Sequence, residues 1–189
     1  MKNLLILTLL LFGIHSINAQ KIISIEAEGN LESPHPLECV SLSEVSSNHN
    51  PADILNGMAK CIKIEEYNKA ARLFAIAGAY GTYDTYRVKD KTAHQALLML
   101  QQNVFSSFDE NQTDLLFQSL KKELESNSEN LTKICSKIKE IGKPVYHPTY
   151  MIQHGIRAFT DNKGNGIVED FDSIESWILT MSSYLKCEE

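Results

Sequence analysis

PADILNGMAKCIKIEEYNKAARLFAIAGAYG, residues 51–81, has the pattern of two helices joined by a short turn. Asn50 stands before it as a helix N-cap, and Pro51 takes the first helical position, where an N–H group is not needed. Apolar residues then recur at helical spacing: Ile54, Leu55, Met58, Cys61 and Ile62. The first half of the stretch therefore predicts an amphipathic helix with one buried face.

A second helix is expected over residues 65–79. Its buried stripe consists of small and large apolar side chains at helical spacing: Ala70, Leu73, Phe74 and Ala77. Gly78 and Gly81 predict the end of this helix, because glycine is the residue that most often terminates one. Residues 82–90 are then expected to form a turn or a short helix.

Further helical patterns follow along the chain, and strand patterns are almost absent. They cover residues 92–104, 111–125, 128–141, 148–159 and 174–185. With the first pair, about seven helices are predicted. The connections are short, so neighbouring helices are expected to pack as antiparallel pairs. The sequence predicts one all-α domain over residues 51–189.

The first residues, MKNLLILTLLLFGIHSINA, have the pattern of a secretory signal peptide. Lys2 gives a positive start, an apolar run follows, and Ala19 is the small residue expected before a cleavage site. The apolar run is too short to span a bilayer as a stable helix. We expect residues 1–19 to be removed and residues 20–50 to be irregular. The mature chain is expected in the periplasm or outside the cell.

Four cysteines remain after the expected cleavage: Cys39, Cys61, Cys135 and Cys187. An even number in an exported chain predicts two disulfides, for which three pairings are possible. We favour the sequential pairing, which would tie the N-terminal segment to the first helix and the last residues to a helix in the middle of the chain. A metal site is disfavoured, since no two cysteines have C-x-x-C spacing.

The chain is mildly acidic, with a formal net charge of −6 at pH 7. Nucleic-acid binding needs clustered Lys and Arg, whereas the basic residues here are interleaved with Glu, so no nucleic-acid partner is expected. The mature chain has no apolar run of about 18 residues, so no membrane span is expected. Common catalytic motifs are also absent from the sequence. The sequence thus predicts no catalytic residue and favours a protein that is not an enzyme.

Four residues of the second helix carry a resemblance to a known repeat: Tyr67, Ala70, Phe74 and Ala77. Their spacing resembles that of the second helix of a tetratricopeptide or Sel1-type repeat, where small residues let paired helices approach closely. The first helix matches less well, and the resemblance covers one unit, residues 51–81. It implies a protein-binding module. Exported bacterial proteins with such hairpins include immunity proteins that neutralise secreted toxins, to which this chain is weakly similar.

The segment 161–172, DNKGNGIVEDFD, has part of the spacing of a calcium-binding EF-hand loop. Gly166 fits the sharp turn, but Lys163 stands at a ligand position and would repel the ion. The alternative is a Gly- and Asn-rich turn whose acidic residues cap the final helix. Four residues take oxygen-ligand positions: Asp161, Asn165, Glu169 and Asp172.

The stretch 79–95 is the candidate interaction surface, because Tyr and Arg are the residues that most often anchor protein interfaces. Five side chains carry this prediction: Tyr80, Tyr83, Asp84, Tyr86 and Arg87. The alternative is that the tyrosines pack under a turn. Three functions stay open: a module that binds another protein, such as a toxin; a hydrolase whose active site no motif reveals; and a calcium-dependent binding domain.

Overall fold

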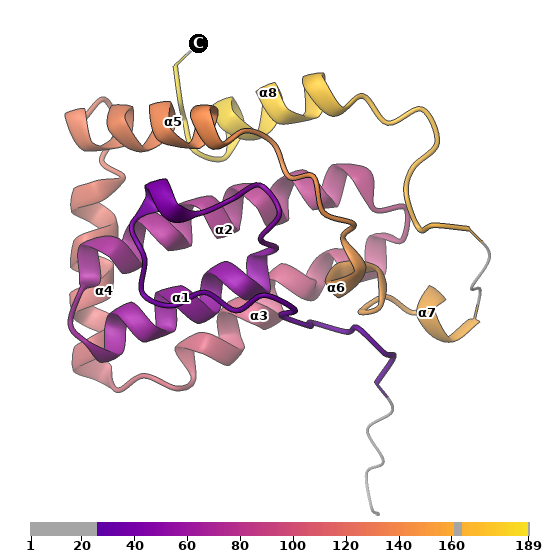
Figure 1. Ribbon diagram of the computed structural model, residues 1–189, viewed down its shortest axis with the longest axis horizontal. Coiled ribbons are helices and arrows are strands. Elements are labelled where there is room, and N and C mark those ends of the chain that lie inside the picture. Colours follow the sequence, from indigo (N-terminus) through magenta and orange to yellow (C-terminus); the bar gives the residue numbers. More distant parts are fainter. Residues whose placement is uncertain (1–25, 161–163, 189) are drawn as a thin grey trace, which may run out of the picture.

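The computed structural model describes residues 26–160 and 164–188, and regular structure in these ranges is helical (Figure 1). The expected leader, residues 1–19, lies outside the described residues. The described ranges contain two short 3-10 helices, eight α-helices and no strand. Their bounds are η1 Leu42–Glu44, α1 Pro51–Lys63, α2 Tyr67–Arg87, η2 Lys91–Gln95, α3 Ala96–Phe105, α4 Glu110–Glu123, α5 Glu129–Ile141, α6 Thr149–Ile152, α7 Arg157–Thr160 and α8 Ser173–Ser183. The all-α prediction is confirmed.

Helix α2 runs through the middle of the molecule, with α1 packed along it as its antiparallel partner (Figure 1). Helices α4 and α8 also pack on α2, and α5 lies along the same edge as α8. The N-terminal segment crosses the face of the α1–α2 pair. The core consists mainly of the inward faces of α1 and α2, on which Ile54, Met58, Leu73 and Ile76 are fully buried.

Helix α1 begins at the residue that the sequence predicts. The Asn50 side chain accepts a hydrogen bond from the Asp53 amide at 2.9 Å, and the Asp53 carboxylate accepts one from the Asn50 amide at 3.0 Å. The same buried carboxylate accepts bonds from the Ser33 hydroxyl and the His35 amide, both at 2.8 Å. The cap of α1 therefore also fixes the N-terminal segment against the helix.

Helix α2 does not end at Gly78 or Gly81, and residues 82–87 do not form the separate turn or short helix expected over 82–90, because α2 continues to Arg87. Both glycines lie inside the helix, at places where another chain segment approaches closely. A Cβ atom on Gly78 would lie 1.8 Å from the Tyr184 hydroxyl, and one on Gly81 would lie 2.6 Å from Leu97 Cδ1. These glycines allow close packing rather than terminating the helix.

Two later boundaries also differ from those expected. The segment 92–104 begins with η2, and its cap is Asp90, whose carboxylate accepts a hydrogen bond from the Thr92 amide at 2.9 Å. The segment 148–159 consists of two short helices, α6 and α7, rather than one. Within the described ranges, no helix combines the length and the apolar character that a membrane crossing needs.

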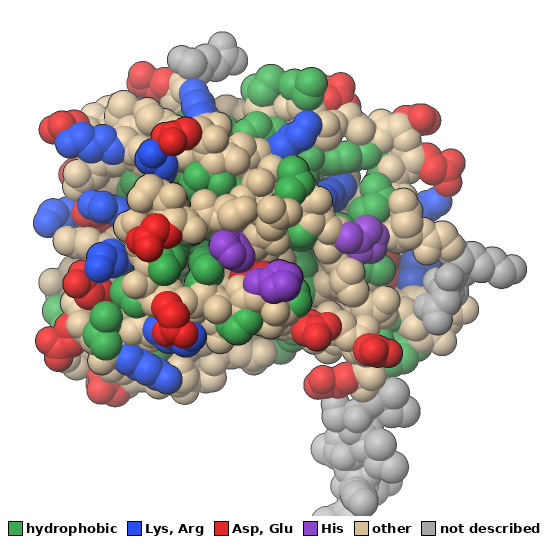
Figure 2. Space-filling model, in the orientation of Figure 1, with side chains coloured by type: hydrophobic (Ala, Val, Ile, Leu, Met, Phe, Trp, Pro, Cys, Tyr) green, Lys and Arg blue, Asp and Glu red, His purple; other side chains and the backbone are tan. Residues whose placement is uncertain are grey.

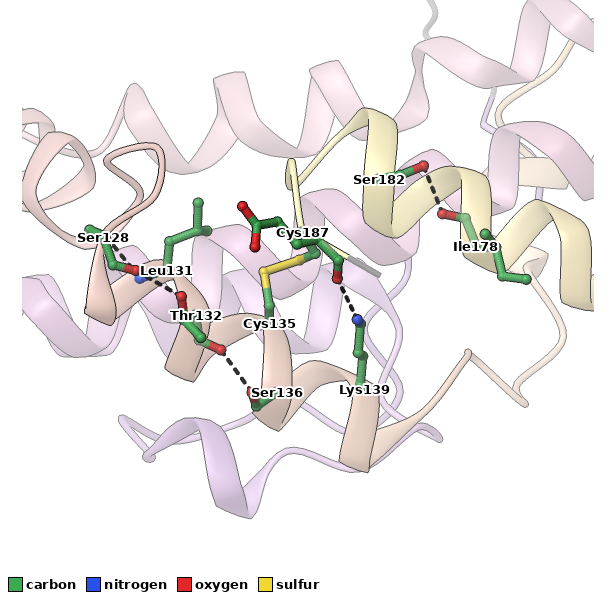
Figure 3. The surroundings of a disulfide bond; sticks show 10 residues. Ser128, Leu131, Thr132, Cys135, Ser136, Lys139, Ile178, Ser182 and Cys187 are labelled. Atoms are coloured by element: carbon green, nitrogen blue, oxygen red, sulfur yellow. Dashed lines mark hydrogen bonds between the residues drawn. A yellow bond between two sulfur atoms is a disulfide. The ribbon is translucent and has the colours of Figure 1, made fainter.

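The sequential disulfide pairing is confirmed. Cys39 bonds to Cys61 with a Cα–Cα distance of 4.6 Å, which ties the N-terminal segment to α1. Cys135 bonds to Cys187 with a Cα–Cα distance of 5.7 Å, which ties the segment after α8 to the middle of α5 (Figure 3). A hydrogen bond from Lys139 Nζ to the Glu188 carbonyl, 2.7 Å long, supports the second link.

The close packing around Gly57 predicts that its replacement by alanine lowers stability instead of raising it. In an exposed helix, replacing Gly with Ala stabilises by about 1 kcal/mol. Here the new Cβ would lie 2.7 Å from the Glu38 carbonyl oxygen, in backbone that the Cys39–Cys61 bond holds in place. We expect Gly57→Ala to lower the free energy of unfolding by about 1–3 kcal/mol, measured by urea denaturation.

The control for this measurement is Gln118→Ala at an exposed position of α4, which should change stability by less than about 0.5 kcal/mol. A Gly57→Ala protein as stable as the parent, or more stable, would contradict the predicted close contact.

Candidate functional site

An open groove of about 1000 Å³ lies at the C-terminal end of α2. Four parts of the chain that are distant in sequence form its walls: residues 26–32, residues 88–90, residues 147–158, and residues 164–169. Acidic side chains gather at this corner of the molecule, where the described chain begins (Figure 2). The groove is the candidate binding site.

The lining of the groove is predominantly acidic. Among the described residues, two cations line it, Lys89 and Arg157, and Lys89 is paired with Glu169 at 3.2 Å. Burial works against the charge of Asp90, but hydrogen bonds from the Arg157 amide and from Thr92 outweigh it, so the pKa of Asp90 is lowered. Five carboxylates line the groove: Glu26, Glu28, Glu32, Asp90 and Glu169.

His147 is part of the wall, and both nitrogens of its ring have partners. Nε2 lies 3.0 Å from the Asn165 carbonyl oxygen and donates to it, while Nδ1 lies 2.9 Å from the Thr149 hydroxyl. This side chain connects the start of α6 to the segment 164–169. Since both nitrogens are engaged, His147 holds two walls together in this arrangement and does not offer a base to a bound molecule.

The end of α2 is joined to the same segment by backbone hydrogen bonds. The Lys89 amide donates to the Gly166 carbonyl and the Val168 amide donates to the Arg87 carbonyl, each at 2.9 Å. These bonds flank an isolated antiparallel bridge between Val88 and Ile167. The groove therefore has a short sheet-like wall in an otherwise helical structure.

A buried ionic cluster lies behind this wall. Asp84 is completely buried, and its Oδ1 accepts a hydrogen bond from Arg87 Nε at 2.7 Å. Its Oδ2 accepts bonds from the hydroxyls of Tyr146 and Tyr150, both at 2.8 Å. Arg87 Nη2 is also 2.7 Å from Oδ1, at an angle that does not make a hydrogen bond. The guanidinium of Arg87 lies between the rings of Tyr83 and Tyr146, 5.2 and 5.0 Å from their centroids.

Burial acts to raise the pKa values of Asp84, Tyr146 and Tyr150 and to lower that of Arg87. It raises the pKa values of the Tyr146 and Tyr150 hydroxyls well above normal, and the charge of Asp84 adds to the rise, so both phenols keep the protons that they donate. Burial also raises the pKa of Asp84, while Arg87 and the two phenols oppose the rise. For Arg87, burial lowers the pKa, but Asp84 outweighs this effect and the pKa is raised.

The cluster positions the groove, because its members are neighbours in sequence of residues that line it. Arg87 precedes Val88, Tyr146 precedes His147, and Tyr150 lies between Thr149 and Ile152. A fully buried carboxylate with donors from two elements fixes the end of α2 against α6. The walls formed by residues 88–90 and 147–158 are therefore held by the same set of hydrogen bonds.

The predicted interface at residues 79–95 is wrong for four of its five residues. Tyr80, Tyr83, Asp84 and Arg87 are buried in the molecule, and only Tyr86 is half-exposed. The reason is the continuation of α2, which directs these side chains toward α6 and α8 instead of placing them on a turn. Tyr80, for example, donates a hydrogen bond to the Gly142 carbonyl at 2.9 Å.

Sequence reasoning did not identify the partners Tyr146 and Tyr150, although one signal was present. Ala77, Tyr80 and Asp84 are spaced by three and four residues, which places a carboxylate on the apolar face of α2. A charged residue on a buried face requires a counter-charge or hydrogen-bond donors. Tyr146 and Tyr150 lie on either side of Pro148, and both hydroxyls reach the Asp84 carboxylate only because the chain folds there.

The predicted calcium loop is only partly described, since Asp161 lies outside the described residues. The other three residues have partners within the protein. Asn165 Oδ1 accepts a hydrogen bond from the Ile167 amide at 3.1 Å, and Glu169 pairs with Lys89. The Asp172 carboxylate caps α8, accepting from the amides of Ile174 and Glu175 at 2.9 Å each. No cluster of three or more potential metal ligands from His, Cys, Asp and Glu occurs in the described part of the chain.

No known protein family, curated protein or solved structure matches this chain. The resemblance to a tetratricopeptide or Sel1-type repeat therefore stays a prediction. The function has to be inferred from the site itself.

Tyr150→Phe tests the buried cluster. The substitution removes a hydroxyl that donates to the fully buried Asp84 and leaves the ring in place. We expect the free energy of unfolding to fall by about 1.5–3 kcal/mol, the usual value for a hydrogen bond to a charged group. Tyr86→Phe, a half-exposed position on α2 outside the cluster, is the control and should change stability by less than about 0.5 kcal/mol. Equal stability of the two variants would contradict the cluster.

The raised tyrosine pKa values predict a loss of stability at alkaline pH. A group whose pKa is higher in the folded state contributes stability below its unfolded pKa, here about 10, and this stability is lost as the pH rises further. We expect the free energy of unfolding to decline above about pH 10. The Tyr146→Phe/Tyr150→Phe variant should show a smaller decline in the same urea titrations. An identical pH dependence would contradict the assignment to these two phenols.

Proposed function

We propose that this protein is a protein-binding module whose acidic groove receives a cationic segment of another protein. The observation that carries the proposal is the composition and bracing of the groove. Among the described residues, five carboxylates and two cations line a hollow of about 1000 Å³, and the buried Asp84 cluster fixes the walls formed by residues 88–90 and 147–158. A stretch of Lys and Arg side chains is the chemistry that complements such a lining.

Three of the five carboxylates are well placed to meet a partner. Glu26, Glu28 and Glu32 are exposed and lie on one wall, which the N-terminal segment forms. Asp90 is engaged by hydrogen bonds from Thr92 and the Arg157 amide, and Glu169 lies beside Lys89, so the remaining carboxylates of the described lining are those of this wall. Exposed charges of one sign accelerate the encounter with an oppositely charged partner and select against others.

The groove also offers apolar contact area and a fixed shape. Ile152, Ile167 and Phe159 line it, and 56% of the Phe159 side chain is exposed. A binding site held in place before the partner arrives loses less conformational entropy on binding. The bridge between Val88 and Ile167 and the hydrogen bonds of His147 supply this rigidity.

We further propose that the chain acts after export and that its partner is a toxin, which it neutralises as an immunity protein. The leader-like residues 1–19 and the two disulfides support an oxidising compartment. The resemblance of residues 51–81 to repeats of exported binding proteins supports the choice of a protein partner. An acidic groove would act by covering a basic surface that the toxin needs.

The test compares two variants with the same loss of charge. In the first, Glu26→Gln/Glu28→Gln/Glu32→Gln removes the exposed acidic wall of the groove. In the control, Glu110→Gln/Asp114→Asn/Glu125→Gln removes three exposed carboxylates on and beside α4, far from the groove. Each protein is expressed with the product of the neighbouring gene, and both growth and the affinity of the purified pair are measured.

We expect the groove variant to lose protection against the toxin and to bind about tenfold more weakly, since three rim charges at about 0.5 kcal/mol each correspond to that factor. The control should protect and bind as the parent does. The affinity of the parent should also fall with rising salt. If the groove variant protects fully, or if both variants weaken equally, the proposed site is wrong.

A further inference from the structure

A second, smaller hollow of about 230 Å³ lies between η1 and α5, away from the acidic groove. Its lining, as far as the structure describes the chain, contains three cations and no carboxylate. In Figure 2, most Lys and Arg side chains of the visible face lie over the half of the molecule that holds α4 and α5. The polar residues of the lining are Ser41, Ser43, Arg72, Asn130, Lys133 and Lys137. The two hollows thus differ in the sign of their charge.

Arg72 is held in position by a buried carboxylate. Its Nε donates to Glu123 Oε2 at 2.7 Å, and only 2% of the Glu123 side chain is exposed. This bond connects α2 to α4 and restricts the guanidinium. Because it uses Nε, the two terminal amino groups of Arg72 keep their N–H donors for a ligand, and 42% of the side chain is exposed. The pocket thus contains a positioned arginine fork.

Lys133 and Lys137 lie one turn apart on α5 and line the same pocket. Their partners in the protein are Glu129 and Glu140 on the same helix, with 82% and 70% of those side chains exposed. Ion pairs as exposed as these contribute little, because water and salt screen them. Both ammonium groups can therefore exchange these partners for an anion in the pocket at small cost.

Neutral donors complete the lining. The hydroxyls of Ser41 and Ser43 are 2.9 Å apart, and the Ser41 hydroxyl also donates to Glu44 at 2.7 Å. The Ser43 hydroxyl then donates to Ser41, which leaves Asn130 as the neutral side chain that can turn a donor toward a ligand. Leu42 and Ile134 supply the apolar part of the wall. The pocket is too small for a folded chain and has the dimensions of a small charged group.

We propose that this pocket binds a tetrahedral oxyanion of the phosphate or sulfate class. Its three cations line the pocket from two helices, α2 and α5, so they can meet different oxygen atoms of one anion. Phosphate offers several oxygens and up to two negative charges, which match an arginine fork and two ammonium groups. The anion is free in solution or is carried by a phospholipid headgroup, and the same donors would recognise both.

The experiment titrates the full chain with inorganic phosphate and follows the heat of binding. Three proteins are compared: the parent; Lys133→Gln/Lys137→Gln, which removes two pocket cations; and Lys121→Gln/Lys122→Gln, which removes the same charge from exposed positions of α4. Arg72 is kept in all three, because its loss would leave Glu123 buried without a partner. Sulfate serves as the competing anion. A second arm measures binding to phosphatidylglycerol vesicles, with phosphatidylcholine vesicles for comparison.

We expect saturable binding of phosphate by the parent and by the α4 variant, displaced by sulfate, and at least about tenfold weaker binding by the pocket variant. Binding to the anionic vesicles alone, lost in the pocket variant and kept in the α4 variant, supports the same site with a headgroup as the source. The proposal is overturned if neither phosphate nor anionic vesicles bind, or if the two lysine variants behave alike.

Discussion

The carboxylate of Asp84 is the group on which the arrangement of the groove depends. It is completely buried and takes hydrogen bonds from Arg87 on its own helix and from two tyrosines on another part of the chain. A buried ion pair is not in itself a large source of stability, since desolvation offsets much of the attraction. It does penalise any arrangement that separates the partners. The cluster therefore specifies where α6 lies relative to the end of α2, and hence the shape of the groove.

Features set by neighbouring residues could be predicted from the sequence. The cap at Asn50, the bounds of α5 and the cap of α8 follow from local hydrogen bonding and apolar spacing. The disulfide pairing is not set by neighbouring residues, because four cysteines allow three pairings and no local pattern distinguishes them. The all-α fold class required only the spacing of apolar residues along the chain.

Features set by distant residues could not be predicted in the same way. Gly78 and Gly81 have the composition of a helix end, yet their role depends on Tyr184 and Leu97, which the chain brings close only when folded. The sequence predicts Tyr80 and Tyr83 at the surface for the same reason, because Trp177, which packs on both rings, is distant in sequence. The groove combines four segments that are far apart in sequence, so no local pattern indicates it. The basic pocket likewise joins residues of η1, α2 and α5.

The Cys135–Cys187 bond also constrains the walls of the groove, although the bond itself does not line it. It closes a covalent ring of the chain across a sequence separation of 52 residues, and this ring contains α6, α7, α8 and the segment 164–169. Two walls of the groove are therefore part of the ring, although the disulfide itself lies at α5. Reduction of this bond would open the ring and leave the two walls held by the Asp84 cluster and by the backbone hydrogen bonds of Lys89 and Val168. The disulfide therefore limits how far these walls can move apart in the unfolded chain, while the buried cluster fixes where they lie in the folded one.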